Sequence, residues 1–244
     1  MYEDPPDPNV DPKEFLDQLK SILKSAEEEM IQLKAETIRT LVRYRSNLPD
    51  MSGVPMSKAD LCSLDLTYVD FTEADLSHAL LVGSNLTQAD LVRTNFFKAN
   101  LGGANLYNAD MTEANFLEAN LAKTDLSEGV LNGANLHKAD IGHGSDLSYA
   151  DLTNANLEGA NLRAAKVPGA IFDGTNLKGA DFSLAENLSE QQLRAGVIDR
   201  NTRLPSYLKI TWKNDSEYEI EFDAEEAKST ANPDDFAPPD PFAS

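Results

Sequence analysis

The residues of this chain with the greatest capacity for chemistry are three histidines and one cysteine. His78, His137 and His143 could bind a metal or transfer protons, and Cys62 could act as a nucleophile, if further groups of this kind lay beside them. The sequence holds no His/Cys cluster at metal-ligand spacing, no glycine-rich phosphate loop and no nucleophile elbow. Carboxylates are plentiful, but no pattern sets two of them in the different environments that acid–base catalysis requires. We therefore predict that the protein is not an enzyme and that it binds no metal and no cofactor.

The charge balance bears on the partners of the protein. With 41 acidic against 21 basic residues the formal charge is −20, which argues against direct nucleic-acid binding and against docking on anionic membranes. No apolar run approaches the roughly 20 residues that cross a bilayer, so we expect no membrane insertion. The acidic, proline-rich start MYEDPPDPNVDP is unlike a secretory signal, and the lone Cys62 suits a reducing compartment. These features predict a cytoplasmic protein.

The elements that position these residues follow from an internal repeat of five residues. From Ala59 to Leu184 the sequence divides into 25 consecutive units, with Gly144 as the one residue out of register. The central position is apolar in all 25 units, the position two before it is Ala in 17, and the position between them is Asp in 11 and Asn in 10. Neither a helix period of 3.6 nor a strand period of 2 gives such a repeat.

The repeat predicts an all-β solenoid. Residues two apart on an extended segment point to the same side, so the Ala and Leu positions face inward and the Asp or Asn between them faces outward. The other two residues of each unit turn a corner. Because one unit cannot bury its Leu alone, successive coils must stack on one another and share a continuous core.

The number of sides per coil follows from positions that match at a spacing of four units. At this spacing Asn95, Asn115 and Asn135 fall on one ladder and Phe96 lies under Phe116. A three-sided coil scrambles these matches. Four sides make about six coils, or a rod about 30 Å long at the ~4.8 Å spacing of strands.

The A-(D/N)-L-x-x units resemble those of the pentapeptide-repeat family, and their Ala/Asn/Leu-rich style resembles its cyanobacterial members. The resemblance covers about half of the chain and implies a right-handed quadrilateral β-helix. It implies no particular function, since most members of the family have none assigned.

The segments that flank the solenoid are predicted to contain other elements. A capping box at Asp11 and Glu14 begins an N-terminal helical extension with a heptad-like apolar stripe, which packs either on the first coil or on another chain. After the solenoid, NLSEQQLRAG predicts a short helix capped by Ser189 and ended by Gly196, and YLKITW with EYEIEF predicts a β-hairpin. The acidic tail with Phe236 and Phe242 could carry a short binding motif or serve only for solubility.

The predicted organisation has six parts. These are a flexible N-terminus at 1–10, a helical extension at 11–48, a linker at 49–58, the repeat β-helix at 59–184, a capping helix and β-hairpin at 185–222, and a disordered acidic tail at 223–244.

Apolar residues at outward positions are the candidate protein-binding site, because these positions should be polar. Phe97 and Leu117 occupy equivalent corners one coil apart and form a predicted exposed pair, with Val92 just before them on the adjoining side. Leu80 with Val82 breaks the polar pattern on another side. We expect either a terminal segment of this chain to cover these residues or a protein partner, including a second copy of the chain, to bind them.

The main functional prediction is a rigid, non-enzymatic scaffold for protein–protein interaction, and the alternative is a DNA mimic. Some members of the pentapeptide-repeat family resemble B-DNA in size and charge and protect DNA gyrase from quinolones. Residues 59–184 carry 17 acids and 7 bases, a net charge of −10. That is about one charge per 3 Å of rod, whereas B-DNA carries one per ~1.7 Å. The partner itself is not identifiable from the sequence.

Overall fold

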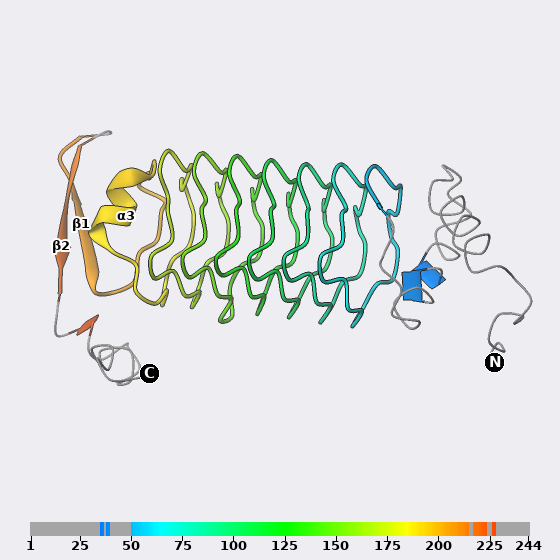
Figure 1. Ribbon diagram of the computed structural model, residues 1–244. Helices are drawn as coiled ribbons and strands as arrows, with labels where there is room; N and C mark the ends of the chain where they lie inside the picture. The colour runs from blue at the N-terminus through cyan, green and yellow to red at the C-terminus, as the bar shows by residue number, and fades with distance from the viewer. Residues whose placement is uncertain (1–34, 37, 40–49, 215–216, 224–225, 228–244) are drawn as a thin grey trace, which may run out of the picture.

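The protein is an elongated solenoid with a small cap at its C-terminal end (Figure 1). The computed structural model describes residues 35–36, 38–39, 50–214, 217–223 and 226–227. The predictions for the N-terminal 1–10 segment, for most of the helical extension and for the tail beyond Ala227 lie outside these residues.

Parallel β-bridges between residues 20 positions apart define the coil. They begin at Pro55↔Asp75 and end at Lys166↔Glu186 on the last regular side, with Asn176↔Val197 and Asp181↔Arg203 continuing into the cap. Twenty residues are four five-residue units, so each coil has four sides, as the matching ladders predicted. Backbone hydrogen bonds such as Leu106 N to Asp125 O, at 2.7 Å, join each side to the next coil.

Each unit closes through a tight turn and a side-chain bond. In the unit around Leu106, the N–H of Ala109 donates to the Leu106 carbonyl at 3.1 Å, and Asn108 takes a left-handed φ of 53°. The outward Asn105 accepts the N–H of Tyr107, two residues on, at 2.8 Å. The outward Asp or Asn is therefore a turn-forming acceptor, and the same geometry recurs from unit to unit.

The interior of the solenoid is filled with apolar side chains. The central Leu, Phe, Met, Ile and Val positions and the Ala positions of the repeat are buried in one continuous cluster. Phe96 and Phe116 stack face to face across two coils, with ring centroids 4.8 Å apart and planes 2° apart. Small Ala beside large Leu lets the two positions share the interior.

The extra residue at Gly144 is absorbed at a corner. Bridges that cross it span 21 residues, as in Asp125↔Asp146, and the spacing returns to 20 afterwards, as in Asp146↔Lys166. Gly144 has a φ of 86°, and the buried Ser145 donates its hydroxyl to the carbonyls of Leu121 and Gly142 at 2.8 and 2.9 Å. The single residue corrects the register and does not break the ladder.

The solenoid begins earlier than predicted. Met51 donates its N–H to the Asp70 carbonyl at 3.0 Å, and Met51, Val54 and Met56 are fully buried. Most of the segment predicted as a linker at 49–58 is therefore already coil. The unit at 54–58 was not recognised from the sequence because Val54 and Pro55 replace the usual Ala and Asp or Asn.

Part of the helical extension contacts the first coil. Ala35 and Ile38 are helical and fully buried in the same cluster as the solenoid core. Arg39 donates to the Asp60 carbonyl at 2.7 Å and pairs with the Asp60 carboxylate at 3.0 Å. For these residues the structure favours packing on the solenoid over packing on another chain.

The C-terminal end is covered by helix α3 (Glu190–Ala195) and by the hairpin of β1 (Leu208–Trp212) and β2 (Tyr218–Phe222). Ser189 caps α3 through a capping box with Gln192, and Gly196 follows the last turn, as the sequence predicted. The Gln192 amide donates to the carbonyls of Val167 and Ala170 at 2.8 and 2.9 Å. Helix α3 thus binds the Ala170 carbonyl, which the N–H of a further coil would otherwise bind, just as the Ala150 carbonyl accepts the N–H of Ile171.

The hairpin is antiparallel, with Leu208 opposite Phe222 and Trp212 opposite Tyr218. Alternate residues of both strands face the cap, and Leu208 and Ile220 are buried there. Figure 1 shows the hairpin beyond α3 at the end of the rod.

Candidate functional site

The outward residues form four ladders along the rod, one on each side. The asparagine face carries Asp75, Asn95, Asn115, Asn135, Asn156 and Asn176. The Leu80 face carries Asp60, Leu80, Asn100, Asn120, Asp140, Asn161 and Asp181. The aspartate face carries Asp70, Asp90, Asp110, Val130, Asp151 and Ile171. The fourth face carries Asp65, Asn85, Asn105, Asp125, Asp146, Lys166 and Glu186.

On the asparagine face the side chains also bond to one another. Asn115 donates its amide to the Asn95 carbonyl oxygen at 2.9 Å, and Asn135 donates to Asn115 at 3.1 Å. The series ends on the carboxylate of Asp75, which accepts from Asn95 at 3.0 Å. Asn therefore contributes a donor along the rod that Asp lacks.

Leu80 and Val82 are the most exposed of the candidate protein-binding residues, with exposed fractions of 44% and 41%. Leu80 lies in the middle of its face, between Asp60 and Asn100 on the neighbouring coils. Val82 lies at the next corner, where the following coil has only Gly102. The two side chains flank the buried Leu81 and form a small exposed apolar surface on an otherwise polar face.

Phe97 and Leu117 are half-buried, so they are less exposed than predicted. The ring of His78 meets Phe97 edge-on at 5.3 Å, and the ammonium of Lys98 lies 5.1 Å from the centre of the same ring. These neighbours cover a ring that the repeat pattern alone places in solvent. Leu117 follows one coil later, where its carbonyl accepts the N–H of Lys98 at 3.0 Å.

Four of the five candidates lie on the Leu80 face or at one of its corners, and the fifth does not. His78 and Leu80 are two residues apart, so Phe97 lies at the corner where the Leu80 face begins. Val92 is half-buried and lies at the other corner of the asparagine face. We define the apolar band as Leu80, Val82, Phe97 and Leu117, and Val92 is not part of it.

The residues considered for chemistry do not converge. Among the described residues no group of three or more His, Cys, Asp or Glu side chains could hold a metal ion. Burial is the main cause of a raised pKa of the Cys62 thiol, and a hydrogen bond with Asp60 is the second cause. The raised pKa lowers the fraction of the thiol that is present as the reactive thiolate.

Ion pairs between coils neutralise part of the acidic surface. Arg93 pairs with Glu73 on one side, at 3.2 Å, and with Glu113 on the other, at 2.8 Å. Lys98 pairs with Glu118 at 3.3 Å. These bases lie one coil from the acids that they contact, so the corner columns alternate in charge.

Three exposed tyrosines were not singled out from the sequence. Tyr68, Tyr107 and Tyr149 lie along one corner of the rod, after the fourth face, with exposed fractions of 71%, 36% and 67%. A hydrogen bond with Glu128 raises the pKa of Tyr107. The only signal in the sequence was the repeat phase, which places all three at turn positions.

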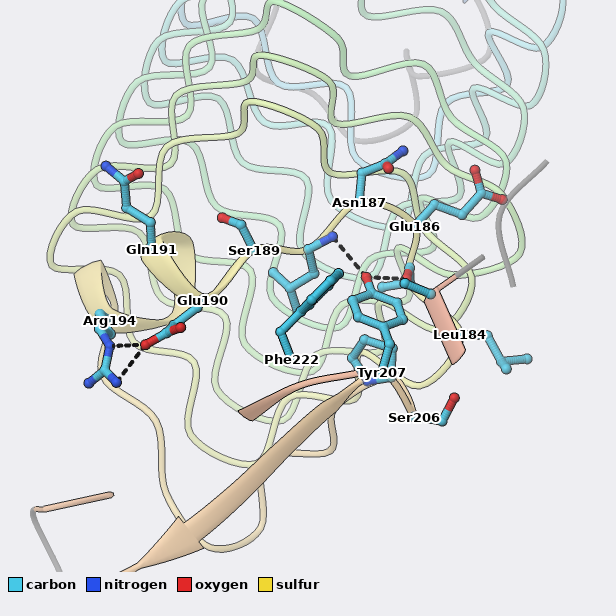
Figure 2. A pocket seen from close by; sticks show the side chains of 14 residues that line it. Leu184, Glu186, Asn187, Ser189, Glu190, Gln191, Arg194, Ser206, Tyr207 and Phe222 are labelled. Atoms are coloured by element: carbon cyan, nitrogen blue, oxygen red, sulfur yellow. Dashed lines mark hydrogen bonds and ion pairs between the residues drawn. The ribbon is translucent and has the colours of Figure 1, made fainter. Parts of the chain in front are cut away.

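A groove at the C-terminal cap was also missed, because its walls come from three separate segments. We define the cap groove as the space of about 670 Å³ lined by the segment 184–191, Arg194, the segment 205–207, Phe222 and Ala227. Figure 2 shows Tyr207 and Phe222 at its centre and the pair of Glu190 and Arg194 at one edge. Leu184 and Phe222 are 52% and 58% exposed there.

These features define a stacked-coil repeat protein with polar ladders on its sides and apolar side chains at a few outward positions. The sequence profile of the family described as pentapeptide repeats matches in eight copies between residues 50 and 183, which is more than half of the chain. The chain belongs to the pentapeptide-repeat family, and its solenoid is a right-handed β-helix.

Solved structures of this family resemble the chain. HetL from the cyanobacterium Nostoc sp. strain PCC 7120, a pentapeptide repeat protein involved in heterocyst differentiation regulation, is 31% identical over 56% of this chain and 71% of that one, with a TM-score of 0.35. Rfr23 from the cyanobacterium Cyanothece 51142 is 33% identical over 45% of this chain and 63% of that one, with a TM-score of 0.29. QnrB1, a plasmid-mediated fluoroquinolone resistance protein, is 18% identical over 64% of this chain and 79% of that one, with a TM-score of 0.45. A comparison with curated proteins gave no match.

Within the described part of the chain, no helix has the length and apolar character needed to cross a membrane.

Proposed function

We propose that this protein is a non-enzymatic scaffold that binds a protein partner through the apolar band. The observation that carries the proposal is the exposure of Leu80 and Val82, at 44% and 41%, on a face whose other outward residues are Asp and Asn. Nothing in the repeat requires an apolar side chain at the position of Leu80, since Asn120 and Asp140 occupy it two and three coils later.

The surroundings of the band suit a partner surface. Asp60 and Asn100 flank Leu80 with polar groups, and the half-buried Phe97 extends the apolar surface to the corner. A small apolar centre with a polar rim is the usual anatomy of an interface. The formal charge of −20 steers a partner with a basic surface toward the rod.

The backbone of the solenoid supports binding without rearrangement. Hydrogen bonds join every regular side to the next coil, and the core is continuous. A rigid surface loses little conformational entropy on binding, so a small apolar band contributes more of its burial energy to affinity. The lone Cys62 is also consistent with the cytoplasmic location that we propose.

Affinity capture with the full chain tests the proposal. The double variant Leu80→Ser, Val82→Ser should lose a captured partner at least tenfold, because its apolar anchors are removed. The matched control is Ile171→Ser, which changes a side chain of similar exposure, 42%, on a different face. Thermal unfolding checks that all variants fold. Equal capture by the double variant and the wild type would exclude the band as the binding surface.

A second copy of the chain is the simplest partner of this kind. Light scattering over a range of concentrations measures the mass, and a dimer that dissociates in the double variant would identify the band as a self-association surface. A dimer that the double variant leaves intact would place self-association elsewhere on the molecule.

The DNA-mimic function has weaker support. The aspartate face is its best surface, with Asp70, Asp90 and Asp110 on successive coils, but Val130 and Ile171 interrupt the series. Arg93 also neutralises two glutamates beside it. We expect purified protein to leave gyrase supercoiling unchanged at micromolar concentration. Inhibition in that assay would make the mimic the better proposal.

A further inference from the structure

The cap groove is an apolar site that the scaffold function does not use. It lies at the C-terminal end of the rod, about five coils from the apolar band at the ~4.8 Å coil spacing. Its volume of about 670 Å³ falls in the range of sites that bind small molecules or short peptide segments.

The floor of the groove is held by Tyr207, which is 5% exposed. Its hydroxyl donates to the Ala185 carbonyl and accepts the N–H of Leu188, both at 3.0 Å (Figure 2). Burial raises the pKa of this phenol, so the hydroxyl keeps its proton and its donor role. The floor of the groove is therefore a fixed part of the fold, because two hydrogen bonds hold the Tyr207 ring in place.

The walls of the groove expose large apolar side chains. Phe222 packs edge-on against the Tyr207 ring, with centroids 5.9 Å apart, yet remains 58% exposed. Leu184 is 52% exposed. The other inward-facing residues of the hairpin are more deeply buried, and Leu208 and Ile220 are 4% and 9% exposed. Apolar surface of this extent beside an aromatic floor can bind a further apolar segment.

The chain itself leaves strand β2 at this groove. Asp223 donates its N–H to the Tyr207 carbonyl at 2.9 Å, and Ala227 donates to the Asp223 carbonyl at 3.0 Å. Ala227 is one of the lining residues. The following 17 residues, 228–244, therefore start at the groove.

We propose that the segment Phe236–Phe242 of the same chain, FAPPDPF, binds in the cap groove. Its two phenylalanines are the only large apolar side chains after Phe222, and they enclose three prolines. Proline-rich segments favour the extended polyproline II conformation and bind aromatic-lined grooves at low entropic cost.

The connection is long enough. Phe236 is nine residues beyond Ala227 and can lie up to about 30 Å from it along an extended chain. A short tether also gives the segment an effective concentration in the millimolar range, so weak binding suffices for high occupancy.

Apolar contact must provide the affinity, because the charges oppose it. Asp235 and Asp240 lie beside or within the segment, while Glu186 and Glu190 line the groove. Among the described residues that line it, Arg194 is the only base. Screening by salt should therefore raise occupancy. A fall in occupancy with salt would contradict binding through apolar contact.

Photo-crosslinking in the full chain tests the proposal. A benzophenone amino acid replaces Phe242, and irradiation of dilute protein should give product of monomer mass. Mass spectrometry should find the cross-links on the segment 184–190 or on Phe222. The variant Phe236→Ser leaves the groove unchanged and should reduce the yield severalfold, because it removes one of the two anchors.

Groove variants provide the matched comparison. Phe222→Ser and, separately, Leu184→Ser should each reduce the yield severalfold, and Val197→Ser should not. Val197 is 47% exposed and does not line the groove. Cross-linked dimers, cross-links mapped outside the groove, or yields unchanged by all three tail and groove variants would each overturn the proposal.

Discussion

Replacement of Asn115 by aspartate separates the two roles of an outward residue in the repeat. The Asn115 carbonyl oxygen accepts the N–H of Leu117 at 3.3 Å and the amide of Asn135 at 3.1 Å. Its own amide donates to Asn95 at 2.9 Å. Aspartate keeps both acceptor bonds but loses the donor, and it places a carboxylate oxygen against the Asn95 oxygen. The substitution therefore tests the ladder without removing the turn.

Asn100 provides the matched control. Its oxygen accepts the N–H of Gly102 at 3.1 Å and the amide of Asn120 at 3.0 Å, in the same arrangement. Its neighbour on the preceding coil is Leu80, which offers no side-chain acceptor, and within the described structure the Asn100 amide donates to no side chain. Asn100→Asp adds the same charge and loses no donor bond.

The magnitudes follow from the bonds. One lost hydrogen bond on a half-buried surface costs about 1 kcal/mol, and the oxygen–oxygen contact raises the expected cost of Asn115→Asp to about 1–2 kcal/mol. Asn100→Asp should change stability by less than about 0.5 kcal/mol, since a carboxylate is the stronger acceptor. Asn115→Ala loses all three bonds and should cost about 2–3 kcal/mol.

Urea unfolding at pH 7, followed by circular dichroism, measures the three free energies of unfolding. Lowering the pH should reduce the cost of Asn115→Asp relative to the wild type, because a protonated carboxyl regains a donor. Equal costs for Asn115→Asp and Asn100→Asp would refute the reasoning, since the charge and not the lost donor would then be responsible.

Three further predictions concern the core, the corners and the response to acid. Phe116→Ala removes one ring of the interior stack and should lower the free energy of unfolding by about 3–5 kcal/mol in the same urea assay; a loss below about 1 kcal/mol would show that the coils collapse around the cavity. Gly169→Ala should lower the melting temperature more than Gly103→Ala. Both glycines have a positive φ, but only at Gly169 does an added Cβ meet another side chain, the Tyr149 ring at 2.5 Å. Equal shifts in melting temperature would show that this contact does not matter. The pKa of Asp60 lies below its ordinary value of 3.8, mainly because its carboxylate accepts the backbone N–H of Cys62. The charged carboxylate therefore stabilises the fold above pH 3.8, and this stabilisation is lost as the pH falls through the lowered pKa. The stability difference between wild type and Asp60→Asn should therefore close in acid, and a difference that stays constant to pH 2 would exclude this origin.

Much of the fold was predictable because the repeat exposes it directly. The apolar centre of each unit, the turn-forming Asp or Asn, and the four-unit match of Asn95 with Asn115 all depend on residues a fixed number of positions apart. The extra residue at Gly144 was recognisable for the same reason. The cap helix was predictable from Ser189 and Gly196, which are local signals.

The errors arose where a neighbouring coil or a distant segment determines the environment. Met51 and Val54 belong to the coil although their two units depart from the usual residues of the repeat. Their hydrogen bonds to the next coil and their burial show this. Phe97 is half-buried because the His78 ring, 19 residues earlier, packs against it. Exposure is a property of stacked neighbours, which the repeat pattern specifies only on average.

The sequence by itself determined the solenoid, its four sides and its polar surface, because a five-residue period can bury its Leu and Ala only by stacking coils. The tertiary structure decided which outward residues are available to a partner. Leu80 remains exposed because Asp60 and Asn100 leave it uncovered, and the cap groove exists because Leu184, Tyr207 and Phe222 meet only after the hairpin folds over α3. Surface sites of this kind depend on side chains far apart in the chain, and no local period encodes their contact.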